Sequence, residues 1–206
     1  MEPLNLYDLQ KHEGLFSIPK CFTVQKHVSF DYRISQDLVK DDVFDFDVYL
    51  VKYGINLQRP YVWEHYQAND FLISVLLEKP INDIVVIKHT DDRRANDFKT
   101  KILVIDGKQR LLTIKKFLLG DICLEVNGVC YYIKDLSEEL RLLFYRRISY
   151  LTATVYYSYF DMEITDNMKI ALFNFYNFSG TPQTVEHKNM LHNLLNSHNT
   201  TNLEQK

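Results

Sequence analysis

A cluster of charged and amide side chains follows a short apolar run in the middle of the chain. Residues 102–105 are apolar and mostly β-branched, Asp106 and Gly107 come next, and apolar residues then recur at helical spacing. This pattern predicts a strand, a tight loop and a helix. Lys108 and Arg110 fall in the first helical turn, where the helix dipole disfavours a positive charge by roughly 0.3–1 kcal/mol each. An anion bound at this helix start would turn that cost into attraction.

The same loop has the parts of a phosphate-binding site. Three features favour phosphate binding: backbone N–H groups at a helix start, neighbouring basic side chains, and a glycine that lets a ligand approach the backbone closely. Two plainer interpretations stay open. Asp106-Gly107 could form only a turn, or Asp106 could serve only as a helix N-cap.

The composition is that of a globular protein with one substantial core. The chain has 206 residues, 46% of them hydrophobic, and a formal net charge of -3. This charge argues against non-specific coating of nucleic acid or anionic membranes. No apolar run approaches the roughly 20 residues that cross a bilayer, and the first residues lack the features of a signal peptide. We therefore expect a cytoplasmic protein without a membrane partner.

The cysteines and histidines predict neither a disulfide nor a metal site. Cys21, Cys123 and Cys130 form no even set and no Cys-x-x-Cys pair, so we expect buried thiols. His187 and His192 are five residues apart and do not share a helical face. A histidine-built metal site is therefore not expected.

Apolar periodicity predicts one α+β domain over residues 51–195. Residues 1–50 are interpreted as a loosely organised, acidic N-terminal extension with a short strand near 28–30, and residues 196–206 as a disordered tail. An Asn127-Gly128 pair predicts a two-residue hairpin turn. The predicted helices cover 65–78, 108–120, a stretch from 137, 166–175 and 182–195, and the predicted strands cover 83–89, 101–105, 122–126, 129–133 and 151–157.

Two further polar stretches interrupt the predicted elements. Arg59 precedes Pro60 and is therefore held in an extended conformation, which presents Gln58 and Arg59 outward. Residues 177–180 break a helix, and Thr181 then supplies a capping hydroxyl ahead of a proline suited to a first helical turn.

These three stretches, in this order, resemble the N-terminal domain of GmrSD-type modification-dependent restriction enzymes. The matching segments are 58–63, 106–110 and 177–182 with Glu186, and the resemblance spans about residues 50–195. It implies a ParB/sulfiredoxin-like fold, a mixed sheet flanked by helices, known by a DGQQR motif. It also implies binding of a nucleoside triphosphate and its hydrolysis, often with a divalent metal, coupled in relatives to a nuclease module that attacks modified DNA.

The resemblance assigns a role to each motif residue. Lys108 and Arg110 would neutralise the phosphates, and Asp106 would hold Mg²⁺ or orient the attacking water. Gln109 would position that water or the γ-phosphate. Gly107 would belong to the phosphate-binding loop. The remaining pocket residues come from the two flanking motifs: Gln58, Arg59, Asn177, Gly180 and Thr181.

The chain departs from the family pattern in two places. Lys108 replaces the first glutamine of the motif, which adds charge for a triphosphate but removes an amide acceptor. Residues 175–177 lack the cation that the family has there. No HNH-type nuclease domain follows the last predicted helix, so autonomous DNA cutting is not expected.

Two function classes therefore stay open, with a third ranked last. The chain is either a slow, Mg²⁺-dependent triphosphatase or a non-catalytic regulatory protein that senses nucleotide or blocks a restriction or defence complex. Phosphotransfer to a small hydroxyl ranks last. The candidate partners are a nucleoside triphosphate, a restriction or defence protein, a second copy of the chain, and DNA through a basic strip of Lys115, Lys116, Arg146 and Arg147.

Overall fold

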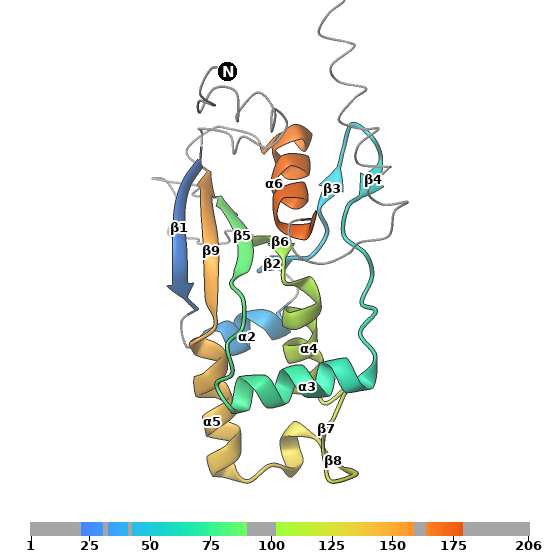
Figure 1. Cartoon of the computed structure of the whole chain (residues 1–206), viewed down its shortest axis with the longest axis vertical. Helices are drawn as coiled ribbons and strands as arrows, with labels where there is room; N and C mark the ends of the chain where they lie inside the picture. Colours follow the sequence, from blue (N-terminus) through green and yellow to red (C-terminus); the bar gives the residue numbers. More distant parts are fainter. Residues whose placement is uncertain (1–21, 31–32, 41–42, 90–101, 159–163, 179–206) are drawn as a thin grey trace, which may run out of the picture.

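A mixed five-stranded sheet forms the centre of the structure (Figure 1). The computed structural model describes residues 22–30, 33–40, 43–89, 102–158 and 164–178. Together with the helices around it, this sheet confirms the predicted α+β fold class. In spatial order its strands are β1 (Phe22–Ser29), β9 (Thr152–Ser158), β5 (Ile84–His89), β6 (Ile102–Asp106) and β2 (Phe44–Asp45).

Parallel and antiparallel pairs alternate across this sheet. β1 pairs antiparallel with β9, and β9 pairs parallel with β5. β5 in turn pairs antiparallel with β6, and β6 pairs parallel with β2. The carboxyl end of β6 therefore lies beside the amino end of β5. Two small hairpins complete the strands: β3 (Tyr49–Leu50) with β4 (Ile55–Asn56), and β7 (Leu124–Val126) with β8 (Val129–Tyr131).

The central strands bury both of their faces, because alternate side chains enter two separate cores. Val86 and Val104 belong to one core, which the helices on that side of the sheet complete. Val85 and Ile105 belong to the other core, which α6 covers. Figure 1 shows α6 apart from the group formed by α3, α4 and α5. The helices are α2 (Ile34–Val39), α3 (His65–Leu76), α4 (Lys108–Leu119), α5 (Glu138–Ser149) and α6 (Asp166–Phe178), with a short 3-10 helix at Ile133–Asp135.

The segment interpreted as an N-terminal extension contributes to the central sheet. β1 is longer than the strand expected near 28–30, and β2 adds a second strand from the same segment. Ile34 and Leu38 of α2 are also fully buried in the core. The described part of this segment is thus packed as part of the domain.

Two predictions need correction. The helix expected to end at Phe175 continues to Phe178, so Asn177 lies in the last turn of α6 and not in a loop. Cys123 and Cys130 are not buried free thiols: they form a disulfide, and Cys130 is exposed. The pairing arises because the hairpin folds the chain back on itself, with Glu125 opposite Cys130. The final helix expected over 182–195 and the tail lie outside the described residues.

The hairpin turn follows the prediction. Asn127 has φ 53° and Gly128 has φ 77°, the pair of positive values that a type I′ turn requires. Within the described ranges, no helix has the length and apolar character needed to cross a membrane.

Candidate functional site

The loop at the end of β6 requires glycine. Gly107 has φ +99°, in the left-handed region that disfavours residues with a Cβ. A Cβ at this position would lie 3.0 Å from two side-chain carbons of Ile84 and 3.3 Å from the Arg110 guanidinium. The glycine therefore allows β6 to turn directly into α4 against the start of β5.

The N-terminus of α4 has no side-chain cap among the residues that the structure describes. Gly107 occupies the N-cap position, and the first turn contains Lys108, Gln109 and Arg110 without an acidic residue. The first intrahelical bond runs from the Leu111 amide to the Gly107 carbonyl, at 3.0 Å. Of the two plain alternatives, the Asp106 N-cap is therefore wrong, because Gly107 holds that position.

Lys108 forms an ion pair whose carboxylate partner is exposed to water. Its Nζ lies 3.2 Å from Oδ1 of Asp47, and the side chains are 10% and 64% exposed, respectively. A hydrogen bond from Asn56 lowers the pKa of Asp47 below its usual value; burial opposes this shift, and Lys108 adds to it. Because Asp47 is exposed, water competes for this pair from one side, and the ammonium can turn to another anion in the cavity.

Arg110 is held by several acceptors at once. Its guanidinium donates to the carbonyl oxygens of Asn82 and Asp83, the latter at 3.2 Å, and to Oδ2 of Asp106 at 2.8 Å. Burial lowers the pKa of Arg110, while Asp106 and Asp83 oppose that shift. The guanidinium stays charged at neutral pH, because an arginine pKa begins far above it. Arg110 thus ties the start of α4 to the turn before β5.

Gln109 bridges α4 to the extended segment before α3. Its Nε2 donates to the carbonyl of Pro60, and its Oε1 accepts from the amide of Val62, both at 2.9 Å. Gln58 makes a similar contact from the other side, donating from Nε2 to the carbonyls of Val104 and Ile105 at 3.0 and 2.9 Å. These two amides fix the segment 58–62 over the end of β6.

The structure brings seven of the predicted site residues to one cavity of about 430 Å³. Pockets for small ligands usually have volumes of a few hundred cubic ångströms. The seven are Gln58, Arg59, Asp106, Gly107, Lys108, Gln109 and Arg110. Trp63, Phe71 and Ile81 add an apolar wall. The cavity therefore combines cations and a helix N-terminus on one side with aromatic and aliphatic surface on another.

The third predicted motif is not placed at this cavity. Asn177 lies in α6, and only its backbone is described. Gly180 and Thr181 lie outside the described residues.

Among the described residues that line this cavity, Asp106 supplies a carboxylate for a divalent cation. Its side chain is 35% exposed, and Oδ2 is bonded to Arg110. Nucleotide-bound Mg²⁺ needs one or two protein carboxylates, because the phosphates and water supply its other ligands. Asp106 fits that requirement. When bound, the ion would neutralise phosphate charge.

Three residues that contact the motif were not predicted from the sequence. Asp47 reaches Lys108 because parallel pairing of β2 with β6 brings the segment after β2 to the start of α4. Asn82 and Asp83 reach Arg110 from the turn before β5. All three lie more than 20 residues from their partners, so no local pattern could have indicated them.

The fold and the cavity define an α+β domain with a polar cavity at the end of a central strand. The chain belongs to the family described as the GmrSD restriction endonuclease, N-terminal domain, whose model matches residues 52–205. This confirms the resemblance carried by the three motifs and relates the chain to restriction systems. No curated protein and no solved structure matches the chain.

Proposed function

We propose that the cavity at the start of α4 binds the phosphates of a nucleoside triphosphate with Mg²⁺, and that the chain hydrolyses it. The observation that carries the proposal is the position of Lys108, in the first turn of a helix that lacks a side-chain cap among the described residues. The backbone N–H groups of that turn and an exchangeable ammonium both favour an anion.

Arg59 strengthens the attraction for phosphate. It lines the same cavity from the opposite segment, is exposed, and makes no ion pair with the part of the chain that the structure describes. Two cations from separate elements could therefore contact one triphosphate. The apolar wall of Trp63 and Ile81 offers a surface for the nucleobase.

Hydrolysis needs a group that positions water, and Gln109 and Asp106 are the proposed residues. Asp106 would act through Mg²⁺ or by accepting a hydrogen bond from the attacking water. Gln109 would act only if nucleotide binding rearranged the contacts of its amide with Pro60 and Val62.

The need to rearrange the Gln109 contacts favours a second candidate function, nucleotide sensing without turnover. In the structure both ends of the Gln109 amide are bonded to backbone, and Arg110 is bonded to three acceptors. In a regulatory domain that binds a triphosphate and acts on a restriction complex, Gln109 and Arg110 would only hold the cavity in shape.

Calorimetric titration with GTP, ATP and CTP in the presence of Mg²⁺, followed by a phosphate-release assay, separates the two functions. Lys108→Ala should weaken binding by about tenfold or more, because a charge-assisted hydrogen bond contributes roughly 1.5–3 kcal/mol. Lys116→Ala is the matched control from the same helix, since this lysine lies over the Tyr61 ring, with Nζ 5.1 Å from the ring centroid.

The release assay decides between turnover and sensing. Asp106→Ala should abolish phosphate release if the domain hydrolyses nucleotide. Saturable binding with no release in the wild type supports the sensor. Absence of binding by all three nucleotides in the folded wild type would contradict both functions.

A further inference from the structure

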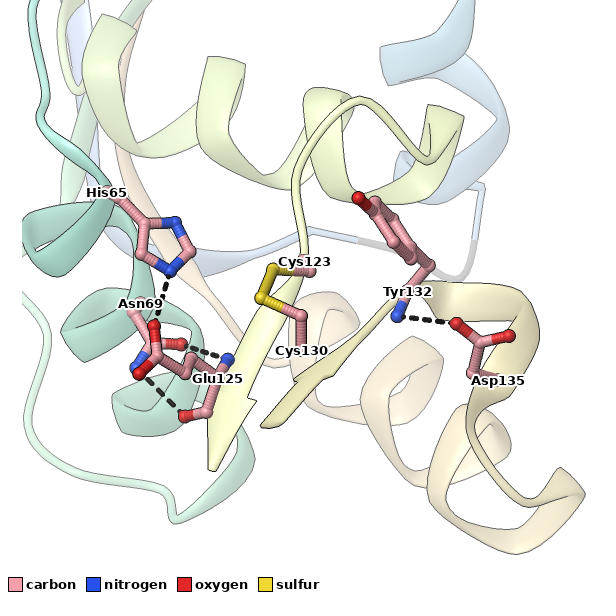
Figure 2. Close-up of a disulfide and its surroundings, with 7 residues drawn as sticks. All are labelled: His65, Asn69, Cys123, Glu125, Cys130, Tyr132 and Asp135. Atoms are coloured by element: carbon pink, nitrogen blue, oxygen red, sulfur yellow. Dashed lines mark hydrogen bonds and ion pairs between the residues drawn. A yellow bond between two sulfur atoms is a disulfide. The ribbon is translucent and has the colours of Figure 1, made fainter. Parts of the chain in front are cut away.

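A second cluster of reactive side chains lies away from the cavity, where the β7–β8 hairpin meets the start of α3 (Figure 2). One ligand atom each from His65, Cys123 and Cys130 lies within 4.8 Å of the others. The two cysteines come from the hairpin, with a Cα–Cα distance of 5.4 Å, and the histidine is the first residue of α3. Two thiols and an imidazole are ligands that Zn²⁺ prefers.

The distances suit a tetrahedral site. Zinc bonds of about 2.0–2.3 Å place neighbouring ligand atoms about 3.5–3.8 Å apart. The sulfur atoms are closer than this in the disulfide, so they must separate when it is reduced. The imidazole nitrogen lies within 4.8 Å of them, so small side-chain movements complete the site. Cys130 and His65 are exposed, so an ion can enter from solvent.

His65 is also oriented as metal-binding histidines are. Its Nε2 lies 3.0 Å from Oε2 of Glu125, which lies in β7 of the hairpin, two residues after Cys123. A carboxylate at this position accepts the Nε2 proton and leaves the lone pair on Nδ1, which fixes the tautomer that binds a metal.

A further contact holds the two elements together without a metal. The Asn69 side chain accepts from the Glu125 amide at 2.7 Å and donates to the Glu125 carbonyl at 3.0 Å. Figure 2 shows this contact beside the His65 and cysteine side chains. This contact fixes the backbone of β7 to α3, and it therefore keeps the cysteines of the hairpin close to His65.

We propose that the reduced chain binds one Zn²⁺ through Cys123, Cys130 and His65, with Glu125 as a positioning residue. A dithiol supplies two electrons that break the disulfide bond, each sulfur takes a proton, and the dithiol becomes a cyclic disulfide. Binding of the metal then releases the two thiol protons to water as two sulfur–zinc bonds form. Oxidation and metal binding exclude each other, because both use the same two sulfurs.

The site would stiffen one wall of the nucleotide cavity. The ion would join the hairpin to the first residue of α3, and Trp63 of the cavity wall lies two residues earlier in the chain. The proposal does not depend on nucleotide binding, because its test uses the metal alone.

Titration of the reduced, desalted full chain with Co²⁺ and then Zn²⁺ under anaerobic conditions tests this site. We expect one Co²⁺ per chain, a thiolate-to-cobalt charge-transfer band, and loss of that band when Zn²⁺ replaces Co²⁺. Cys123→Ser and Cys130→Ser should each lose the band, and His65→Gln should bind at least about tenfold more weakly. Cys21→Ser, the matched control, should behave as the wild type does.

Glu125→Gln separates positioning from ligation, since it should weaken binding by about tenfold while the charge-transfer band persists. The oxidised wild type, in which no thiolate is present, should bind no metal even if the cysteine variants fail to fold. A reduced wild type that is folded by circular dichroism but shows no band would overturn the proposal. Equal affinity in His65→Gln or in the oxidised chain would also overturn it.

Discussion

The starts of α3 and α4 satisfy their backbone groups in opposite ways. At α3, the Glu64 side chain accepts from the backbone of Gln67, and the Gln67 side chain accepts from the Glu64 amide at 3.0 Å. This is a complete capping box. At α4, Gly107 provides no such contact, and the first turn has two cations. The first helix start is satisfied by its own residues, whereas the second is suited to an external anion.

The two glutamines show the same difference. Gln67 folds back onto its own helix start, whereas Gln109 reaches across to Pro60 and Val62 of another segment. One glutamine therefore stabilises a helix start, whereas the other holds a segment of the cavity wall in place. A polar first turn therefore indicates a binding site only when its donors and acceptors are not used within the helix.

Gly107→Ala should have the largest effect on stability. The left-handed backbone costs about 1–2 kcal/mol for a residue with a Cβ, and the close contact with Ile84 adds to that cost. Gly120→Ala is the matched control, since Gly120 also has positive φ, of +80°, but a Cβ there meets no described atom within 4 Å. Urea unfolding of both variants gives the two costs, and equal losses would show that crowding at Ile84 contributes nothing.

Gln109→Ala should destabilise the domain by about 1–3 kcal/mol, because the Val62 amide and the Pro60 carbonyl lose partly buried partners. Gln67→Ala, which breaks only the exposed capping box, should cost about 0.5–1 kcal/mol. Urea unfolding measures both. If Gln67→Ala cost as much as Gln109→Ala, the distinction between the two helix starts would fail.

Asp83→Asn should change the acid stability of the domain. Burial raises the pKa of Asp83, but hydrogen bonds from Thr152, Thr154 and His27 outweigh it and hold the pKa below its ordinary value of 3.8. Because the folded-state pKa is lowered, the stabilisation is present above pH 3.8 and is lost as pH falls through the folded value. Urea midpoints measured from pH 7 downward should fall less steeply below about pH 4 in Asp83→Asn. Identical slopes would contradict this role.

Lys108→Ala should have only a small effect on stability, about 1 kcal/mol, because Lys108 is 10% exposed but its partner Asp47 is 64% exposed. Thermal melts without nucleotide measure this effect. A loss above about 2 kcal/mol would mean that Lys108 supports the fold, in which case weaker nucleotide binding by this variant could not be assigned to a lost phosphate contact.

Elements with regular patterns could be predicted from the sequence. The apolar runs that form β5 and β6, and the Asn127-Gly128 turn, have the period and turn residues that these structures require. β1 was largely missed because a bulge between Gln25 and Val28, with His27 at φ 54°, breaks its alternation. β2, with two residues, is too short to show a period.

The candidate site could be predicted only in part. The charged residues of the 106–110 loop are adjacent in the sequence, so they could be predicted as a site. The atoms that they contact depend on the pairing of the strands and could not be predicted. The Asp47 and Asn82 contacts come from other elements, so the sequence could not indicate that Arg110 is held internally while Lys108 is exchangeable. The Cys123–Cys130 pair was missed for the same reason, because hairpin register and not spacing brings the cysteines together.

We propose that phosphate binds at the start of α4. The most direct test is the change in amide ¹⁵N chemical shifts of the full chain on adding a nucleoside triphosphate with Mg²⁺, compared with the nucleoside alone. We predict that the largest shifts occur at residues 107–110 and require the phosphates. Shifts absent from these amides, or equally large at residues 64–67 of the capped helix start, would contradict phosphate binding at the start of α4.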